Sequence, residues 1–410
     1  RFNNSLKSLI NREQNIFEGL NIRYFGPFDG HDVETLVRVL RDIKDFRGPR
    51  ILHLRTVKGK GFIPAEKDPA VWHAPGKFDP TTGQRAKENP TLPPKYQDIF
   101  GEKLVEMAQA DPRIVAVTAA MPSGTSVSMM QERFPDRTFD VGISEGHAVT
   151  FAGGLAKDGM RPYVAIYSSF LQRAYSHIIH DVAIAGLPVT LCLDRAGLVG
   201  EDGPTHHGAF DIAYLRSIPG MIVAAPRDGD ELRAMMEASK SAGGPMAIRY
   251  PRGRARKAPD KSYPERTITI GRGQRLREGD DLVVLTLGTV ADDAAKAIDR
   301  AEKELGLSVA HYDMRFAKPL DKEIMAEVIS KNVPVITVED GIKDGGMGSA
   351  VLEWLNSHAA VVEGALPPVT RLGIPDNFVP HGSPAQLHAL CGYDADGIYN
   401  AIAAQKLSRS

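Results

Sequence analysis

The sequence predicts an α/β protein built from parallel sheets flanked by helices, in three α/β domains of which the first is incomplete. Two observations carry this prediction. Short apolar runs of strand length alternate with stretches of helix length from residue 97 onward, which is typical of parallel strands joined by crossover helices. A polar segment at residues 255–266 interrupts this alternation, and a second series follows it. A chain of 410 residues is also long enough for two or three domains.

The first domain is expected to cover residues 1–92 and to be the remnant of a larger one. A helical segment is the expectation for residues 1–22, followed by a helix over 33–42 and a strand over 50–56. Prolines, glycines and charged residues dominate from 64 to 94, which predicts an ordered loop that becomes a linker. The sequence starts at Arg1 within a basic polar stretch. We therefore expect it to be part of a longer protein.

The second domain, residues 93–262, and the third, residues 263–410, repeat the strand–helix alternation. In the second domain a short strand is expected near Phe139, and the other predicted strands are 114–118, 163–167, 188–193, 221–225 and 246–250. Its predicted helices are 102–110, 148–157, 171–185 and 231–242. The predicted strands of the third domain are 282–287, 309–312, 333–338 and 369–372.

Composition excludes several functional classes. Hydrophobic residues make up 42% and charged residues 25% of the chain, and 50 basic against 51 acidic residues leave a net charge of −1. These values are typical of globular proteins and give no sign of a nucleic-acid or membrane partner. No apolar run approaches the roughly 20 residues of a membrane helix. The cysteines, Cys192 and Cys391, suggest neither a disulfide framework nor a metal site, so a reducing cytoplasm is expected.

The stretch from Phe139 to Leu155 is the most informative in the chain. A short apolar strand leads to Ser144, a good helix N-cap, and Glu145 then opens a helix of small residues. Glu145 would thus project from the carboxyl end of a strand, where open α/β sheets bind their ligands. The alternative is an ordinary first-turn acid that the helix dipole favours.

Three further polar clusters follow predicted strands of the second domain. They are residues 167–173, which include Tyr167 and Arg173, the glycine-containing loop 194–211 with His206 and His207, and residues 250–253 with Arg252. Each cluster alone has a structural explanation, such as an ion pair or a loop histidine bonded to backbone. Together, at strand ends of one sheet, they indicate a ligand site. Because neither a metal-spaced His/Cys set nor a nucleophile elbow is present, acid–base work on a bound cofactor is favoured.

The glycine run at residues 345–348 follows a predicted strand and precedes a helix. It can hold an anion, but a pure turn is the favoured interpretation. His53, inside a strand, is expected to be structural.

The sequence resembles a known family, the 1-deoxy-D-xylulose-5-phosphate synthases, which are thiamine-diphosphate enzymes related to transketolase. The resemblance covers nearly the whole chain. Its most specific pieces are residues 26–32, 58–69, 73–80, 167–175 and 194–211. It implies a transketolase-like fold, with a pyrimidine-binding second domain and a third domain like the C-terminal domain of transketolase. It also implies a cytoplasmic homodimer that needs thiamine diphosphate and Mg²⁺.

The resemblance further implies a reaction and its residues. Pyruvate would condense with D-glyceraldehyde 3-phosphate, with loss of carbon dioxide, to give 1-deoxy-D-xylulose 5-phosphate, an early intermediate of isoprenoid, thiamine and pyridoxal biosynthesis. Glu145 matches the glutamate that hydrogen-bonds the cofactor's pyrimidine, and Phe62 and Phe170 match aromatic residues beside the cofactor. His73 and His206 match histidines near the reacting carbon. The residues matched around the acceptor substrate are Tyr167, Arg173, Asp202 and Arg252.

Two departures from the family pattern stand out. Gly146 follows the matched glutamate, where glutamine is common. The Gly-Asp-Gly…Asn motif that holds metal and diphosphate is absent, because Asp228-Gly229 follows Arg227 and has no suitably spaced asparagine. We therefore assign no metal ligand in this chain, and expect that motif upstream of Arg1.

Two competing hypotheses remain open. The β component of a 2-oxo-acid dehydrogenase pairs the same two later domains, but the segments at 58–69 and 73–80 argue against it. A catalytically silent regulatory partner would keep the folds, but intact Glu145 and His206 weigh against that.

Overall fold

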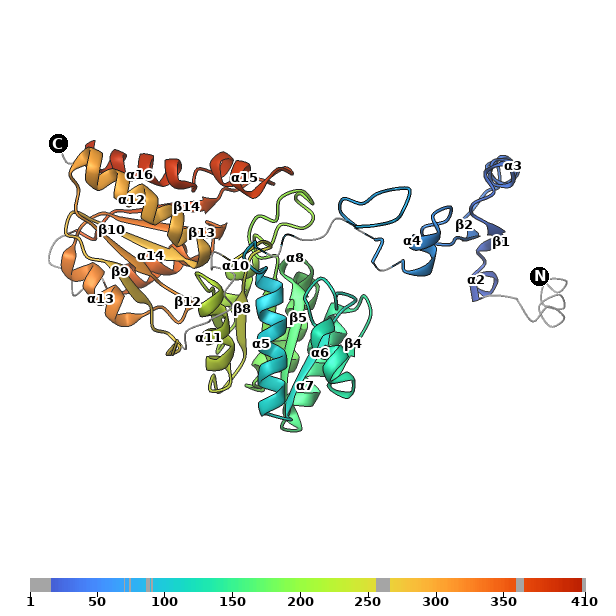
Figure 1. The fold of residues 1–410 in the computed structure, drawn as a ribbon, viewed down its shortest axis with the longest axis horizontal. Coiled ribbons are helices and arrows are strands. Elements are labelled where there is room, and N and C mark those ends of the chain that lie inside the picture. Colours follow the sequence, from blue (N-terminus) through green and yellow to red (C-terminus); the bar gives the residue numbers. More distant parts are fainter. Residues whose placement is uncertain are drawn as a thin grey trace. The chain divides into compact units, whose positions relative to one another are not determined.

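The chain divides into two compact units, Arg1–Asn89 and Pro90–Ser410 (Figure 1). The computed structural model describes residues 16–69, 71–73, 75–85, 89, 91–255, 266–358 and 365–407. The first fifteen residues, which carry most of the helical segment predicted for 1–22, therefore lie outside the described residues.

The first unit holds a two-stranded parallel sheet of β1 (Arg23–Asp29) and β2 (Arg50–Arg55). Helix α3 (Val33–Ile43) connects them, and Asp32 caps it by accepting a hydrogen bond from the Thr35 amide at 3.0 Å. The short helices of the unit are α2 (Ile16–Gly19) and α4 (Ile63–Lys67). Helix α4 corrects the prediction of a loop from residue 64. Its proline lies in the first turn, where the missing N–H has no intrahelical partner to lose.

The second unit begins with a seven-stranded sheet in the order β12-β7-β8-β6-β5-β3-β4. Its neighbours are parallel except β12 and β7. The strands are β3 (Ile114–Thr118), β4 (Thr138–Asp140), β5 (Arg161–Tyr167), β6 (Thr190–Asp194), β7 (Ile222–Ala224), β8 (Met246–Arg249) and β12 (Phe316–Lys318). All the predicted strands of this part are present within a few residues.

The helices of this part are α5 (Tyr96–Ala110), α6 (Ser128–Arg133), α7 (Glu145–Lys157), α8 (Ser168–Leu171), α9 (Tyr175–His177), α10 (Asp211–Arg216) and α11 (Gly229–Ser239). Two predictions need correction. Ser144 stands at the N-cap position of α7, but its side chain makes no capping hydrogen bond. The single helix predicted over 171–185 is instead a sequence of short α-helical, 3₁₀ and π-helical turns, the last at Ile178–Ala183.

A second sheet of five strands follows, in the order β14-β13-β10-β11-β9. Its strands are β9 (Gln274–Arg277), β10 (Leu282–Leu287), β11 (Val309–Asp313), β13 (Val335–Ile342) and β14 (Val369–Ile374). Only β9, which was not predicted, runs antiparallel among these five. The helices are α12 (Ala291–Leu305), α13 (Lys322–Lys331), α14 (Met347–Ser357), α15 (Pro384–Cys391) and α16 (Ala395–Leu407).

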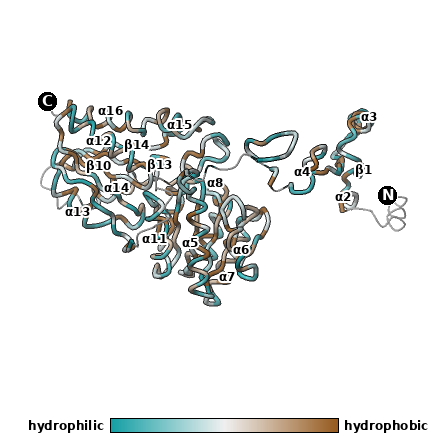
Figure 2. Tube along the Cα trace, viewed as in Figure 1, coloured by the Kyte–Doolittle hydropathy of each residue, from teal (hydrophilic) through white to brown (hydrophobic). Residues whose placement is uncertain are grey.

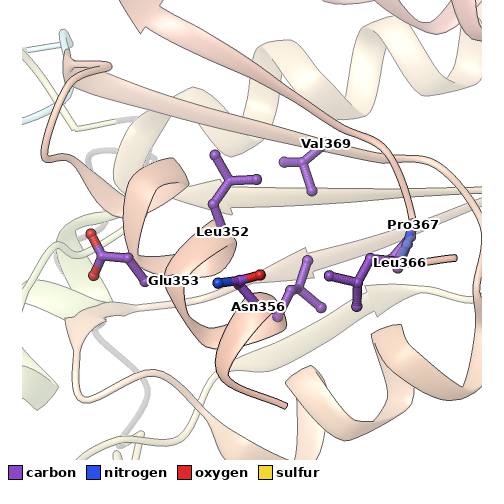
Figure 3. A pocket seen from close by; sticks show the side chains of 7 residues that line it. Leu352, Glu353, Asn356, Leu366, Pro367 and Val369 are labelled. Carbon is purple, nitrogen blue, oxygen red and sulfur yellow. The ribbon is translucent and has the colours of Figure 1, made fainter. Parts of the chain in front are cut away.

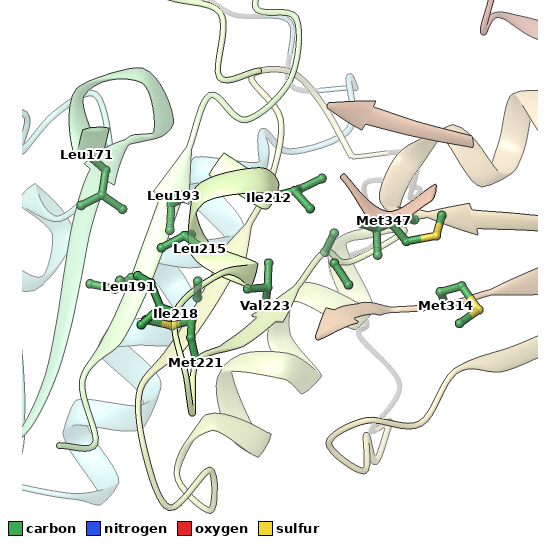
Figure 4. Close-up of a cluster of buried hydrophobic side chains, with 14 of the residues drawn as sticks. Leu171, Leu191, Leu193, Ile212, Leu215, Ile218, Met221, Val223, Met314 and Met347 are labelled. Atoms are coloured by element: carbon green, nitrogen blue, oxygen red, sulfur yellow. The ribbon is translucent and has the colours of Figure 1, made fainter. Parts of the chain in front are cut away.

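The two sheets of the second unit share one hydrophobic core. Buried side chains from the first sheet, such as Leu193 and Val223, belong to the same cluster as Met314 and Met347 from the part around the second sheet (Figure 4). Figure 2 shows the hydropathy of each residue along the same trace, with apolar residues in brown and hydrophilic residues in teal. Strand β12 adds a direct link, because it lies in the predicted third domain and pairs with β7 of the seven-stranded sheet. The predicted domain boundaries at residues 92 and 262 stay a prediction.

The α/β fold class is confirmed, with the addition of one antiparallel edge strand to each sheet of the second unit. Within the described part of the chain, no helix combines the length and the apolar character that crossing a bilayer requires.

Candidate active site

The polar clusters predicted from the sequence lie at one edge of the seven-stranded sheet. Strands β8, β6, β5, β3 and β4 are successive neighbours and all parallel. Their carboxyl ends therefore meet at the same edge. Tyr167 at the end of β5 is in register with Asp194 at the end of β6. Glu145 opens the helix after β4, and Arg252 follows β8.

Glu145 is a buried carboxylate whose side chain is only 4% exposed. It receives one hydrogen bond, from Arg173 Nη1 to its Oε1 at 3.0 Å. Its second oxygen, Oε2, accepts no hydrogen bond from any residue that the structure describes. A buried carboxylate is unfavourable without a hydrogen-bond partner, and Arg173 is that partner here. The other oxygen is free to accept a hydrogen bond from a ligand or to share a proton with it. The first-turn-acid explanation from the sequence does not account for the pairing with Arg173.

Aromatic rings extend this pair toward the loop 194–211. The Phe170 ring lies under the Arg173 guanidinium, with 5.0 Å between Cζ and the ring centroid. It also stacks on Tyr167 at 5.7 Å and meets the His206 ring edge-on at 5.4 Å. Five of the predicted site residues, Glu145, Arg173, Phe170, Tyr167 and His206, thus form one continuous chain of contacts.

Asp202 and Arg252 form a second pair at the same edge. Arg252 Nη1 lies 3.0 Å from Asp202 Oδ2, and it also approaches the Val199 carbonyl oxygen at 3.4 Å. The side chain of Arg252 is 38% exposed and that of Asp202 is 50% exposed. Solvent-exposed ion pairs contribute little to stability, so this pair is easily exchanged for a ligand. A guanidinium has five N–H donors and can bind an anion while keeping one carboxylate contact.

Arg195 is a residue of this site that the sequence interpretation did not single out. Its guanidinium lies over the Tyr167 ring at 4.1 Å, and its Nη1 donates to the Gly124 carbonyl at 2.6 Å. It also pairs with Asp194 at 3.0 Å. Burial outweighs that attraction and raises the pKa of Asp194 to about 6. The feature of the sequence that could have identified Arg195 is its position directly after Asp194, the acid that ends strand β6.

Gly124 explains how closely Tyr167 can pack. A Cβ atom at Gly124 would lie 1.9 Å from the Tyr167 hydroxyl oxygen. Burial also raises the pKa of Tyr167, so the hydroxyl stays a hydrogen-bond donor at neutral pH.

Two predicted site residues, Phe62 and His73, belong to the first unit. Phe62 is half-buried in an aromatic cluster, with ring centroids 4.8 Å from Trp72 and 5.8 Å from Phe78. His73 is exposed. The glycine-hinged loop before Phe62 is tightly packed at Gly59, where a Cβ would lie 2.5 Å from the Ala65 Cβ.

The residues of the second unit fit the pyrimidine half of a thiamine diphosphate. Buried Glu145 with a free oxygen beside the Phe170 ring suits a flat nitrogen heterocycle. Among the described residues, no group of three or more His, Cys, Asp or Glu side chains could hold a metal ion. Asp228, the nearest match to the absent motif, caps α11 by accepting from the Glu231 amide at 2.9 Å.

Two other features do not belong to this site, a glycine run and a cavity. The glycine run at 345–348 wraps the chain's own Glu339, whose oxygens accept from the Met347 and Gly348 amides at 2.7 and 2.8 Å. The acidic group at this helix N-terminus is therefore a side chain of the protein itself and not a bound ligand. A cavity of about 420 Å³ lies between α14 and β14 (Figure 3), and none of its lining residues is a predicted site residue.

Comparison with known proteins bears on this site. A family model described as transketolase, pyrimidine binding domain, matches residues 93–257, and one described as transketolase, C-terminal domain, matches 271–398. A solved structure described as a split-gene transketolase, inactive beta4 tetramer, is 30% identical with a TM-score of 0.66. The match covers 76% of this chain and 97% of that one. The chain belongs to the transketolase family.

A further family model and curated relatives show a more specific similarity, to one enzyme of this family. A family model described as 1-deoxy-D-xylulose-5-phosphate synthase matches residues 1–56. The protein of that name from Bacteroides fragilis is 57% identical over 409 residues, which are 99% of this chain and 62% of the relative. The one from Bacteroides thetaiotaomicron is 57% identical over 407 residues, with the same coverage of 99% and 62%. The chain thus spans about 62% of the length of these curated relatives.

Proposed function

We propose that this chain supplies the pyrimidine-binding part of a 1-deoxy-D-xylulose-5-phosphate synthase. The complete enzyme would condense pyruvate with D-glyceraldehyde 3-phosphate, with loss of carbon dioxide, to 1-deoxy-D-xylulose 5-phosphate. It would thus be a transferase of isoprenoid biosynthesis that also feeds thiamine and pyridoxal biosynthesis. The observation that carries the proposal is buried Glu145, held on one oxygen by Arg173 and free on the other, next to the Phe170 ring. Identity of 57% to relatives of that name supports the choice of reaction.

Glu145 has the central role in the proposal. Its free Oε2 would share a proton with the ring nitrogen of the cofactor's pyrimidine: the protonated carboxyl would donate to the bare nitrogen, and the carboxylate would accept a hydrogen bond from the nitrogen once that is protonated. Because the carboxylate is buried, it shares that proton where a solvated carboxylate would not. Arg173 fixes the carboxylate through Oε1 and so leaves Oε2 directed at the ligand. When bound, thiamine diphosphate supplies the thiazolium that accepts the electron pair released on decarboxylation.

The remaining residues bind and orient. Phe170 provides a flat apolar surface for the pyrimidine, and Phe62 of the first unit is assigned to cofactor binding from its match to the family's aromatic position. His206 and, in the first unit, His73 are assigned hydrogen bonding to substrate oxygens and proton transfer at them. The acceptor aldehyde is bound by Tyr167, Arg173, Asp202 and Arg252. The two arginines suit its phosphate dianion, because a guanidinium forms strong paired hydrogen bonds with phosphate oxygens.

Mg²⁺ is part of the proposal, although the described residues contain no group of three or more His, Cys, Asp or Glu side chains that could bind it. We infer that its ligands come from the part of the relatives that this chain does not cover.

We also propose a cytoplasmic homodimer. Cys192 and Cys391 are both free thiols, as a reducing compartment favours. Near the start of α7, Ile143 is 87% exposed, and a hollow of about 450 Å³ is lined by residues that include Phe139 and Phe151. An exposed apolar surface of this kind suits a second subunit.

The test uses a complemented protein, in which residues 1–410 are joined to the part of the Bacteroides fragilis relative that they do not cover. With pyruvate, D-glyceraldehyde 3-phosphate, thiamine diphosphate and Mg²⁺, we expect 1-deoxy-D-xylulose 5-phosphate and carbon dioxide in equal amounts by mass spectrometry. Leaving out the cofactor or either substrate should abolish product. Two-carbon transfer from a ketose phosphate, without use of pyruvate, would contradict the proposal and favour ordinary transketolase activity.

A further inference from the structure

The loop that carries Asp202 and His206 is anchored in the C-terminal part of the chain. Residues 197–208 form a loop closed at its base, where the Gly197 and Gly208 amides each donate to the other's carbonyl at 2.9 and 2.8 Å. Leu198, near this base, is buried in one hydrophobic cluster with Val379 and Tyr393. The tip at Glu201 and Asp202 is exposed.

Three polar contacts attach the buried side of this loop to the C-terminal domain. The Leu198 amide donates to Asp340 Oδ1 at 3.0 Å, and the Gly382 amide donates to the Gly200 carbonyl at 3.3 Å. The third contact runs through His207, which lies 3.2 Å from the Pro380 carbonyl oxygen through its Nε2. His207 is only 5% exposed.

His207 is also bonded within the loop, and its two contacts define its tautomer. The Val199 amide donates to Nδ1 at 3.1 Å, so Nδ1 carries no proton. Nε2 then holds the N–H and donates it to the Pro380 carbonyl, which can only accept. The neutral ring therefore bridges the loop to the C-terminal domain with both nitrogens satisfied.

Val199 connects this bridge to the candidate substrate residues. Its amide is held by His207, and its carbonyl oxygen is approached by Arg252 Nη1 at 3.4 Å. The same Nη1 donates to Asp202 Oδ2 at 3.0 Å. A shift of Val199 would therefore displace Arg252 and Asp202 together.

We propose that His207 is a positioning residue, through which the C-terminal domain sets the places of Arg252 and Asp202 for the acceptor substrate. This inference rests on the proposed function for the identity of that substrate. It gives the C-terminal domain a role in the site, although the domain contributes none of the predicted site residues. His207 acts through Val199 and does not need to touch the substrate.

The kinetic test uses His207→Leu in the complemented protein. Leucine has a similar volume and removes both hydrogen bonds. We expect KM for D-glyceraldehyde 3-phosphate to rise about tenfold, the effect of losing one typical hydrogen bond's net contribution. KM for pyruvate and hydrogen exchange at the cofactor's C2 should change less than about twofold, because Glu145 lies outside this chain of contacts. A KM for the aldehyde that stays at the wild-type value would overturn the inference.

His207→Gln is the rescue variant and Tyr312→Phe the matched control. The glutamine amide can still donate to the Pro380 carbonyl, so it should recover most of the lost affinity for the aldehyde. Tyr312→Phe removes a hydrogen bond of 2.6 Å to Glu327 in the C-terminal domain and involves neither His207 nor Asp340. It should lower Tm without a selective effect on the aldehyde. If it raises that KM as much as His207→Leu does, the effect is general destabilisation and the inference is wrong.

A second measurement needs no activity. In residues 1–410 alone, amide hydrogen exchange of the peptide over 198–206 should become at least about tenfold faster in His207→Leu and stay unchanged in Tyr312→Phe. Equal exchange in wild type and His207→Leu would overturn the inference. If His207→Leu does not fold, His207→Asn replaces it, because its Oδ1 can still accept from the Val199 amide while its shorter side chain brings no N–H to the Pro380 carbonyl. Absence of product from the wild-type complemented protein would refute the proposed function instead, and the exchange comparison would still decide the role of His207.

Discussion

Glu145 shows how one side chain can be held ready for proton sharing. The carboxylate is buried, and Arg173 donates to one of its oxygens, Oε1, at 3.0 Å. The side chain of Arg173 is 59% exposed, so its attraction for Glu145 is partly screened by solvent. The contact with Arg173 holds one oxygen and leaves the other for a ligand.

Glu145→Gln should nearly abolish turnover of the complemented protein, with a loss of about 10²- to 10⁴-fold in kcat, because glutamine cannot take up the shared proton. Hydrogen exchange at the cofactor's C2, followed by NMR, should slow to a similar degree. Tm should change little, since glutamine fills the same space. Glu132→Gln, an exposed glutamate of α6, is the control. An exchange rate equal to wild type would remove Glu145 from the role proposed for it.

Arg252→Ala should raise KM for D-glyceraldehyde 3-phosphate by about 10- to 100-fold, the range for a lost charge-assisted hydrogen bond. The loss should be smaller with unphosphorylated glyceraldehyde, and KM for pyruvate should hardly change. Arg173→Ala should show the same selectivity and, in addition, slow C2 exchange, because Arg173 also binds Glu145. Arg133→Ala, at the exposed end of α6, is the control. Equal losses with both aldehydes would place these arginines outside the phosphate site.

Individual residues could be predicted where a strand end and a polar cluster coincide. Glu145, Arg173 and Tyr167 were predicted in this way and Phe170 from the family resemblance, and the structure brings the four side chains together. Arg195 was missed because its role depends on Tyr167, which is 28 positions away and becomes its neighbour only through the pairing of β5 with β6. Its position directly after a strand-terminal acid places it at the sheet edge, but the contact with Tyr167 cannot be seen along the chain.

At the scale of elements, the N-terminus of α14 is arranged around a buried acid. Glu339 is fully buried and accepts hydrogen bonds from two amides of the first turn. The glycines leave room for it, since a Cβ at Gly346 would lie 2.3 Å from its Oε2. Burial outweighs these hydrogen bonds and raises the pKa of Glu339 from 4.5 to about 7.

The raised pKa predicts a pH-dependent stability. A carboxyl group with a higher pKa in the folded state stabilises the fold fully below its unfolded pKa, and that contribution is lost as pH rises through about 7. We expect a loss of up to about 3 kcal/mol between pH 4.5 and 8 in urea unfolding of residues 1–410. Glu339→Gln should flatten this dependence, while exposed Glu278→Gln should keep it. A wild-type profile that is flat over this range would contradict the prediction.

Elements were predicted well where their hydrophobic pattern is set by the sheet and less well elsewhere. Strands such as β3 and β10 have the predicted bounds, because fully buried strands are continuous apolar runs. The segment 171–185 was expected to be one helix, but α-, 3₁₀- and π-helical turns place apolar residues at similar spacings. Strand β12 was missed, since a three-residue edge strand has no periodicity to detect.

At the scale of the whole molecule, the fold class followed from the sequence because strand–helix alternation leaves few alternatives. The attachment of the loop 197–208 to the C-terminal domain did not follow from it. It depends on single contacts such as His207 to Pro380, which are separated by 173 positions. The loop that carries Asp202 and His206 therefore joins parts that the sequence presents as separate domains.

The last prediction concerns cofactor binding by residues 1–410 alone. The diphosphate of thiamine diphosphate must be neutralised, usually by a divalent cation on oxygen ligands. The described residues include no group of three or more His, Cys, Asp or Glu side chains for such an ion, and Asp228 is already used as a helix cap. We therefore expect calorimetry to show little Mg²⁺-dependent binding of thiamine diphosphate.

The complemented protein provides the comparison for this prediction. It should bind the cofactor with a clear dependence on Mg²⁺, whereas residues 1–410 should bind it equally weakly with Mg²⁺ and with EDTA. Thiamine without phosphates should bind weakly to both proteins, because its pyrimidine contacts at Glu145 and Phe170 lack the charged anchor. Tight, Mg²⁺-dependent binding by residues 1–410 would mean that this chain contains its own diphosphate site, and the inference that the metal ligands come from elsewhere would be wrong.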